Sequence, residues 1–178
     1  ASGDATRKLL ATKGRESVRG GLYANARVQR LPAVALPVGT YVIMVEGAGD
    51  YDLTLRDLGP VPDDWEAEPN NSYYNANHLA IGDSMRGQSS DNDTDYVSFD
   101  VPEAQYVGMR FAAPDDATIQ VDLSHRHHEA FGAVRLSPGE SFDQVFWLEK
   151  GEYALSFGRW SGVVFNDRWK LEIYTPPP

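Results

Sequence analysis

The sequence contains no cysteine, no long apolar run and few basic residues. Without Cys there can be no disulfide, no thiolate nucleophile and no Cys-based zinc or iron–sulfur site. No apolar run approaches the ~20 residues that a membrane-spanning helix needs. Sixteen Lys and Arg stand against 26 Asp and Glu, a formal charge of −10, whereas nucleic-acid binding requires clustered positive charge. We therefore expect no nucleic-acid partner and no membrane span, and the acidity permits divalent cations or basic partners.

Apolar residues are nonetheless plentiful, at 42% of the chain, and they follow the period of β-strands. Apolar and polar residues alternate at 51–55, 96–101, 119–123 and 169–173, and 41–45 is a β-branched apolar run. An alternation with a period of two marks strands with one face on a core. Gly and Pro separate these runs, as in sandwiches and barrels. The sequence predicts an all-β protein, with one or two helical turns at 73–79.

An internal repeat relates the two ends of the chain. Residues 36–45 resemble residues 148–157, because a Leu, a Gly and a Tyr each recur 112 positions later (148 − 36, 151 − 39, 153 − 41). Residues 51–55 then resemble 169–173 with an offset of 118 (169 − 51). The second copy therefore carries a loop longer by six residues (118 − 112). Each copy is predicted to form a strand, a tight turn at Gly, a second strand, a loop and a closing strand.

The two copies are unequal, which sets the expected domain organisation. Residues 66–178 read as a complete β-module, residues 61–65 as a linker, and residues 1–60 as the C-terminal half of the same kind of module. A half sandwich would expose an apolar face and unpaired strand edges. Either its beginning was removed, or another element or another chain covers that face.

Two acidic clusters lie near the start of the complete module. The first is the run Glu66-Ala-Glu-Pro-Asn-Asn-Ser72, and the second is Asp91-Asn-Asp-Thr-Asp-Tyr96. Hard cations such as Ca²⁺ take six to eight oxygen ligands from carboxylates, amides and backbone carbonyls. The spacing does not fit an EF-hand loop, because Tyr96 would occupy the position of the turn glycine. The clusters are therefore either two separated halves of a cation site or solvated turn residues.

A family resemblance emerges from the order of these motifs. The run Glu-Pro-Asn-Asn-Ser, the alternating strand that begins at Asp93 and Asp95, and the later Gly151-x-Tyr153 strand together resemble the bacterial pre-peptidase C-terminal domain, over residues 64–175. That family is related to the collagen-binding domains of clostridial collagenases. The resemblance implies an antiparallel, jelly-roll-like β-sandwich, here one complete module preceded by a partial copy. It also implies possible Ca²⁺ ligands, which in this sequence are Glu66, Glu68, Asn70, Asp93 and Asp95. Asn71 departs from the family, which often has Asp there.

No catalytic constellation stands out in the sequence. It has no Gly-x-Ser-x-Gly elbow, no His-Glu-x-x-His motif and no Gly-rich phosphate loop before a helix. We therefore expect no catalytic residues and no enzyme activity. Aromatic residues could instead form a binding surface. The candidates are Trp160, placed in the loop 158–162 that the first copy lacks, Trp147, Tyr73 and Tyr74, and packing in the core is the alternative for each.

The resemblance suggests a function. It implies a non-catalytic accessory module of a secreted or surface bacterial protein, which aids secretion or adheres to a polysaccharide or an extracellular protein polymer. Its partners would be that polymer and the parent enzyme or surface protein. The alternative is a structural or interaction fragment of a larger assembly, in which another chain completes the N-terminal half-module.

Overall fold

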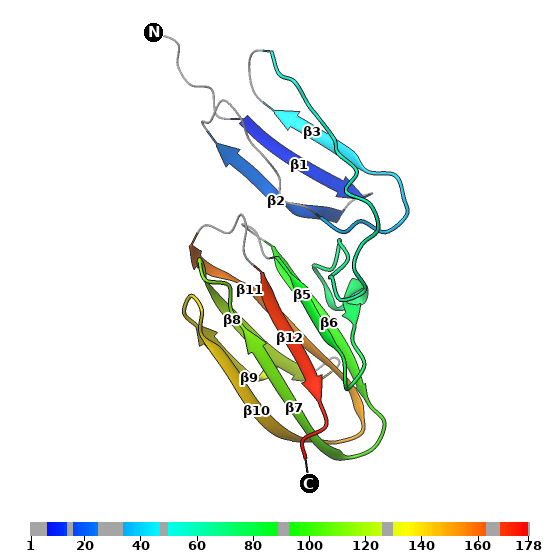
Figure 1. Cartoon of the computed structure of the whole chain (residues 1–178), viewed down its shortest axis with the longest axis vertical. Coiled ribbons are helices and arrows are strands. Elements are labelled where there is room, and N and C mark those ends of the chain that lie inside the picture. The colour runs from blue at the N-terminus through cyan, green and yellow to red at the C-terminus, as the bar shows by residue number, and fades with distance from the viewer. Residues whose placement is uncertain are drawn as a thin grey trace.

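Alternating apolar residues place one face of most strands in a common core. In the strand Ala117–His125, the residues Ala117, Ile119, Val121 and Leu123 are buried while their neighbours are half-buried. The strand Trp169–Tyr174 repeats this pattern. In the computed structural model (Figure 1), the described residues are 7–13, 16–24, 34–46, 50–88, 93–125, 130–162 and 168–177. No helix among them is long or apolar enough to traverse a bilayer.

Three sheets contain all the strands of the described residues. The strands are β1 (Arg7–Lys13), β2 (Glu16–Ala24), β3 (Val42–Glu46), β4 (Asn77–His78), β5 (Ser84–Gly87), β6 (Thr94–Val101), β7 (Gln105–Ala112), β8 (Ala117–His125), β9 (Ala130–Leu136), β10 (Ser141–Leu148), β11 (Gly151–Gly162) and β12 (Trp169–Tyr174). The orders are β2-β1-β3, β10-β7-β12-β5 and β4-β6-β11-β8-β9. All pairings between these strands are antiparallel except the short one between β4 and β6.

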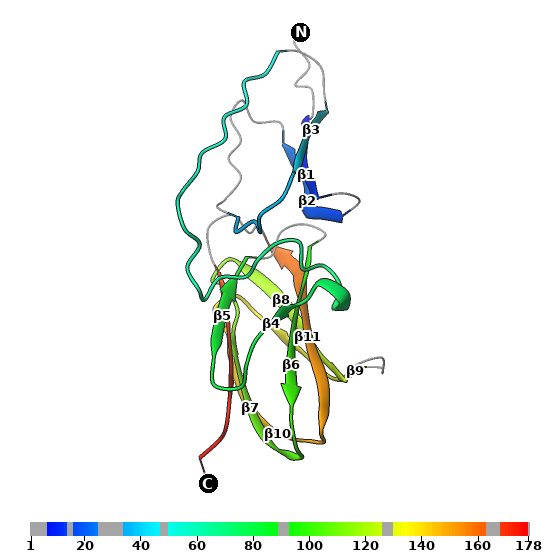
Figure 2. The same ribbon diagram turned by 90° about the vertical axis from the view of Figure 1, so that its right-hand side faces the viewer.

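The four-stranded and five-stranded sheets pack face to face as a β-sandwich (Figures 1 and 2). Three aromatic rings join the two layers. The ring of Phe157 on β11 lies 4.4 Å from that of Trp169 on β12 and 5.2 Å from that of Phe111 on β7. All three side chains are fully buried. The expected all-β, antiparallel sandwich is confirmed, and its core lies within residues 79–173.

The N-terminal sheet lies beyond one end of this sandwich (Figure 2). A hairpin of β1 and β2 forms two of its strands, and β3 pairs with β1. The sequence pattern did not predict that hairpin. Val42 and Met44 of β3 expose 59% and 39% of their surface, so this strand presents apolar side chains to solvent.

Two local expectations are wrong and one holds in part. Residues 51–55, predicted as a closing strand, form extended coil with exposed Tyr51, Leu53 and Leu55. Of the one or two helical turns predicted at 73–79, one is present as the 3₁₀ turn η1 (Tyr73–Asn75), and β4 follows it. The predicted loop 158–162 is instead the end of β11. It continues to pair with β8 through Gly162, with a shift of register between Arg159 and Ser161.

Candidate metal centre

The first acidic cluster lies on a loop that two sets of hydrogen bonds hold against the sandwich. The backbone N–H of Glu66 donates to the carbonyl of Arg86 on β5 at 3.0 Å. Asn77 brackets the next residue, since its Oδ1 accepts from the N–H of Ala67 at 2.8 Å and its Nδ2 donates to the Ala67 carbonyl at 3.1 Å. The loop is thereby fixed in the segment between Glu66 and Glu68.

The second cluster lies at the start of β6. Asp95 is the second residue of that strand, and its Oδ2 accepts a hydrogen bond from the indole N–H of Trp169 at 3.1 Å. The N–H of Tyr96 donates to the carbonyl of Asn70 at 3.0 Å, which joins β6 to the first cluster. Two segments about 25 residues apart in sequence therefore meet at one end of the sandwich.

Three carboxylates converge where the segments meet. Glu66, Glu68 and Asp95 each present an oxygen within 4.8 Å of the other two. They are 6%, 1% and 0% exposed. Acidic turn residues in solvent would be well exposed, so burial excludes that alternative for these three. Asp93 is 3% exposed and lies beside the group.

The electrostatics of this group favour a positive charge. Burial raises the pKa of Glu66 well above its ordinary value, and the negative charges of Asp95 and Glu68 raise that pKa further. A hydrogen bond from the N–H of Gln88 lowers the pKa of Glu66 by a smaller effect, and Asp93 contributes a small increase. Like charges disfavour the ionisation of one another, and a bound cation would remove that repulsion.

An amide oxygen adds a neutral donor to the group. Asn70 is 0% exposed, and its Nδ2 donates to Oε2 of Glu66 at 3.1 Å. Among the described residues, Oδ1 of Asn70 has no hydrogen-bond partner. A buried amide oxygen left without a donor costs free energy of about 1–3 kcal/mol. A cation in contact with this oxygen would compensate for the missing donor.

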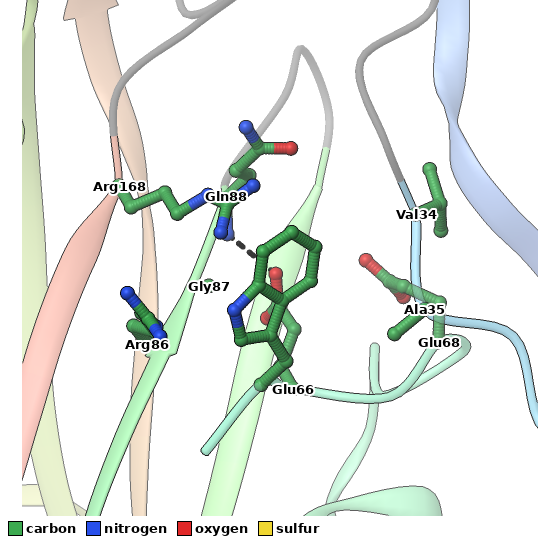
Figure 3. Close-up of a pocket in the computed structure, with 9 residues that line it drawn as sticks. Val34, Ala35, Glu66, Glu68, Arg86, Gly87, Gln88 and Arg168 are labelled. Carbon is green, nitrogen blue, oxygen red and sulfur yellow. Dashed lines mark hydrogen bonds between the residues drawn. The ribbon is translucent and has the colours of Figure 1, made fainter. Parts of the chain in front are cut away.

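Gly87 makes room for the Glu66 carboxylate. A Cβ at that position would lie 2.2 Å from Cδ of Glu66 and 2.2 Å from Cζ2 of Trp169. The glycine on β5 therefore lets the carboxylate lie directly on the sheet backbone, where the N–H of Gln88 reaches it (Figure 3).

The N-terminal part of the chain closes one side of the site. The N–H of Glu68 donates to the carbonyl of Ala35 at 2.9 Å, and Ala35 is buried. Val34 and Ala35 line a small pocket together with Glu66 and Glu68 (Figure 3). Trp65 and Arg168 also line this pocket, and the Trp65 ring centroid lies 3.4 Å from Cζ of Arg168.

The structure brings together four of the five predicted ligands and places the fifth beside them. Glu66, Glu68 and Asp95 form the carboxylate group, Asn70 bonds to Glu66, and Asp93 is adjacent. Asp91 lies outside the described residues. Sequence reasoning missed Gly87, Gln88 and Ala35, because their roles depend on backbone atoms and the absence of a side chain, which no motif records.

Among the predicted aromatic binding residues whose side chains are described, Trp147 lies on β10 whereas Tyr73 and Tyr74 lie at η1. Trp147 on β10 is 55% exposed, and its ring lies 4.9 Å from that of Tyr106 on β7, which is 59% exposed. Tyr74 is 86% exposed at η1, where the partly buried ring of Tyr73 lies 6.1 Å away. The backbone of Trp160 belongs to β11, and its side chain lies outside the described residues.

Polar residues continue the outer face of the sheet beyond Trp147 and Tyr106. Arg110 on β7 contacts Asp143 on β10 at 2.7 Å and Glu172 on β12 at 2.9 Å. Tyr174 donates to Asp143, and Arg110 lies 5.3 Å from the Tyr174 ring. The hydrogen bond from Tyr174, followed by that from Arg110, lowers the pKa of Asp143. This outer face thus combines aromatic rings with charged hydrogen-bonding groups.

No protein-family profile matches this sequence. No curated protein matches it either. Among solved structures, the chain is similar to the pre-peptidase C-terminal domain of a collagenase from Bacillus anthracis, with 17% identity and a TM-score of 0.48 over 55% of this chain and 93% of that one. It is also similar to the periplasmic inhibitor of g-type lysozyme from Aeromonas hydrophila, with 10% identity and a TM-score of 0.39 over 55% of this chain and 96% of that one.

A third solved structure is a β-glucosidase from Paenibacillus barengoltzii, with 17% identity and a TM-score of 0.30. That match covers 54% of this chain and only 11% of the β-glucosidase. The first of the three is a pre-peptidase C-terminal domain, the kind of domain that the sequence motifs resemble.

Proposed function

We propose that this chain is a non-catalytic accessory module of a secreted or surface bacterial protein, and that Ca²⁺ stabilises its sandwich. The observation that carries the calcium site is the convergence of three buried carboxylate oxygens within 4.8 Å. The raised pKa of Glu66 and the unsatisfied Oδ1 of Asn70 support it. The motif order described above supports the accessory role.

The donor atoms favour a hard cation. Glu66, Glu68, Asp95 and Asn70 offer carboxylate and amide oxygens, whereas transition metals favour imidazole or thiolate. Ca²⁺ tolerates an irregular set of oxygen ligands better than Mg²⁺, which keeps a strict octahedron and several waters.

Thermal unfolding with CaCl₂ and with EDTA tests the site. A ligand that binds only the folded state stabilises it by RT ln(1 + [L]/Kd), about 2.7 kcal/mol at 100 times Kd. We expect millimolar Ca²⁺ to raise the Tm of the wild-type protein by several degrees. Asp95→Asn should abolish that increase, because it removes a ligand charge but keeps an oxygen to accept from Trp169.

Asp100→Asn is the matched control for this test, since Asp100 lies on the same strand and is exposed. It should keep the full calcium response. An unchanged Tm of the wild-type protein in millimolar Ca²⁺ would exclude the calcium site, and an equal loss in both variants would place the effect elsewhere.

Adhesion to a polymer is the second part of the proposal. The exposed pair Trp147 and Tyr106 and the adjacent Arg110 network support a surface that binds a polysaccharide or an extracellular protein polymer. Exposed aromatic rings are frequent energetic centres of binding surfaces. The parent enzyme or surface protein would then be held at its polymer by this face.

Retention on insoluble polysaccharides and on collagen tests the surface. We expect Trp147→Ala to weaken retention by about tenfold, the effect of losing a binding residue worth about 1.4 kcal/mol. Tyr74→Ala is the control, since Tyr74 is exposed at η1, away from the four-stranded sheet. If Tyr74→Ala and not Trp147→Ala weakens retention, the binding surface lies at η1. No retention of the wild-type protein on any polymer would reject adhesion.

A further inference from the structure

The pairing of β3 on β1 in the N-terminal sheet repeats, residue by residue, the pairing of β11 on β8 in the sandwich. Leu9 pairs with Val45 between β1 and β3, and Val121 pairs with Phe157 between β8 and β11. Both members of the second pair lie 112 positions after those of the first (121 − 9, 157 − 45). The register of β3 on β1 is therefore that of β11 on β8.

The same offset relates the two hairpins over Arg7 to Leu9, before a register shift in β1 and β2. Leu9 pairs with Leu22 between β1 and β2, and Val121 pairs with Val134 between β8 and β9. These partners also differ by 112 (121 − 9, 134 − 22). The order β2-β1-β3 thus reproduces β9-β8-β11. The internal repeat begins at β1, well before the segment 36–45 in which the sequence reveals it.

A side-chain hydrogen bond recurs as well. The hydroxyl of Tyr153, next to the start of β11, donates to the carbonyl of Glu149 at 3.0 Å. The hydroxyl of Tyr41, just before β3, donates to the carbonyl of Pro37 at 2.6 Å. These pairs are again 112 positions apart (153 − 41, 149 − 37). A tyrosine that bonds to a backbone carbonyl a few residues upstream fixes the entry to a strand.

The repeat identifies the strands that the first unit does not have. In the sandwich, β11 pairs on its second side with β6, whereas no strand among the described residues pairs with the second side of β3. The strand β12 pairs with β7 and with β5. Its counterpart at 51–55 has no such neighbours in the described part of the chain and forms coil.

The exposure of β12 and of its counterpart at 51–55 shows which side chains such neighbouring strands would cover. Trp169, Leu171 and Ile173 of β12 are each 0% exposed. Their counterparts, with the offset of 118 (169 − 51), are Tyr51, Leu53 and Leu55, which are 58%, 47% and 74% exposed. Figure 2 shows this segment, between Asp50 and Pro60, as an extended coil outside the N-terminal sheet. An alternating apolar segment of this kind forms a stable strand only when it is paired and covered.

We propose that the N-terminal unit is an acceptor for a polypeptide segment built like β4–β7, which completes it as a second sandwich. One strand of that segment would pair with the free side of β3 in the register of β6 on β11. A second strand would lie beside residues 51–55 in the register of β7 on β12. This inference depends on the repeated pairing and not on calcium or adhesion, so it stands or fails separately from the proposed function.

A fusion protein tests the proposal on the whole chain. In the second unit, β4–β7 directly precede β8, so a copy of residues 64–112 is joined in front of Ala1. This spacing is natural, because six residues then separate the copied β7 from Arg7, as six separate Ala112 from Ile119. We expect hydrogen exchange of amides 42–46 and 51–55 to slow by more than about tenfold in the fusion.

The matched control is the same fusion with Phe99→Asp and Phe111→Asp in the copied segment only, since both side chains are fully buried in the sandwich. It should give no protection. Equal protection in the control, or no protection in the intact fusion, would overturn the proposal. Concentration-dependent protection in the unfused chain would overturn it too, because a second copy would then occupy the edge.

A disulfide reads out the register directly, because the native chain has no Cys. Ser98 pairs with Ala154, whose counterpart is Val42 (154 − 112). We expect Ser98→Cys in the copied segment to form a disulfide with Val42→Cys. A Cys in place of Thr94 of the copied segment should not, since Thr94 pairs four residues further along β11, with Gly158. Absence of the first disulfide or formation of the second would contradict the register.

Discussion

Gly87 is the residue where the sheet and the candidate metal centre meet. Its missing side chain leaves space for the Glu66 carboxylate and for the ring of Trp169. The same absence lets the N–H of Gln88 approach a charged acceptor, which is a stronger bond than one between neutral groups. The geometry of the centre therefore depends on one residue that contributes no donor atom.

Gly87→Ala should destabilise the fold and the site together. The added methyl group meets two side chains at 2.2 Å, and overpacking of this kind typically costs about 1–3 kcal/mol. We expect the midpoint of urea unfolding to fall and the calcium response to disappear. Gly132→Ala on β9 is the control, because the nearest atom to its Cβ would be 4.0 Å away. A Gly87→Ala protein as stable as this control would show that the Glu66 carboxylate lies elsewhere.

The raised pKa of Glu66 predicts a pH dependence with a definite sign. The folded state holds this proton more tightly than the unfolded chain, so protonation of Glu66 favours folding. As the pH rises above the ordinary value of 4.5, the metal-free protein should lose that part of its stability. Calcium replaces the proton, so its stabilising effect should grow with pH over the same window.

The measurement is the Tm of the wild-type protein and of Glu66→Gln across pH, with EDTA and with CaCl₂. The difference between the two proteins in EDTA isolates Glu66 from carboxylates such as Asp143, whose lowered pKa acts in the opposite direction. A difference that does not change with pH would contradict the raised pKa of Glu66.

At the scale of elements, the tyrosine hydrogen bond at the start of β11 and its counterpart before β3 have different surroundings. Tyr153 and Tyr41 make equivalent hydrogen bonds, but Tyr153 is buried in the sandwich while Tyr41 is half-buried beside an exposed strand. The same local sequence therefore stabilises a complete unit in one place and a partial unit in the other.

Tyr153→Phe and Tyr41→Phe separate these contributions. The first should lower the free energy of unfolding of the sandwich by about 0.5–1.5 kcal/mol, the net value of one hydrogen bond. The second should leave the main unfolding transition unchanged, because the core lies within residues 79–173. Chemical denaturation followed by tryptophan fluorescence measures both. Equal effects of the two substitutions would mean that the two units unfold as one.

Most elements that the sequence predicted correctly are strands of the sandwich, which have paired neighbours among the described residues. Alternation identified β6, β8 and β12, because each has one face in the core of the sandwich. The same alternation at 51–55 predicted a strand where the structure has coil. Periodicity shows that a segment could form a strand, but it does not show whether a neighbouring strand pairs with it. The carboxylates were named from the family resemblance of the two acidic clusters, because their spacing alone also fits solvated turns, whereas Gly87 and the Ala35 carbonyl required the folded backbone.

For the whole molecule, the position of the core predicts which part folds independently. The buried cluster uses only residues 79–173, and the candidate ligands lie between 66 and 95. A fragment of residues 63–178 should therefore unfold cooperatively and keep its calcium response. It loses the Ala35 hydrogen bond to Glu68, a change of about 0.5–1.5 kcal/mol. Calorimetry of the fragment and the whole chain measures this, and a broad, non-cooperative transition in the fragment would contradict the prediction.

The hydrogen bond from Glu68 to Ala35 also has a mechanical consequence. It joins two points that residues 36–67 separate in the sequence, so it holds the two ends of this segment together. A force that pulls on the N-terminal unit acts first on this hydrogen bond, beside the carboxylates, and only then on the paired strands of the sandwich. Because β3 stays paired with β1, release would free only the residues between β3 and Glu68 and lengthen the tether by at most about 70 Å, at roughly 3.3 Å per extended residue. A moderate pulling force would thus extend the segment in front of Glu68, while the sandwich stays folded.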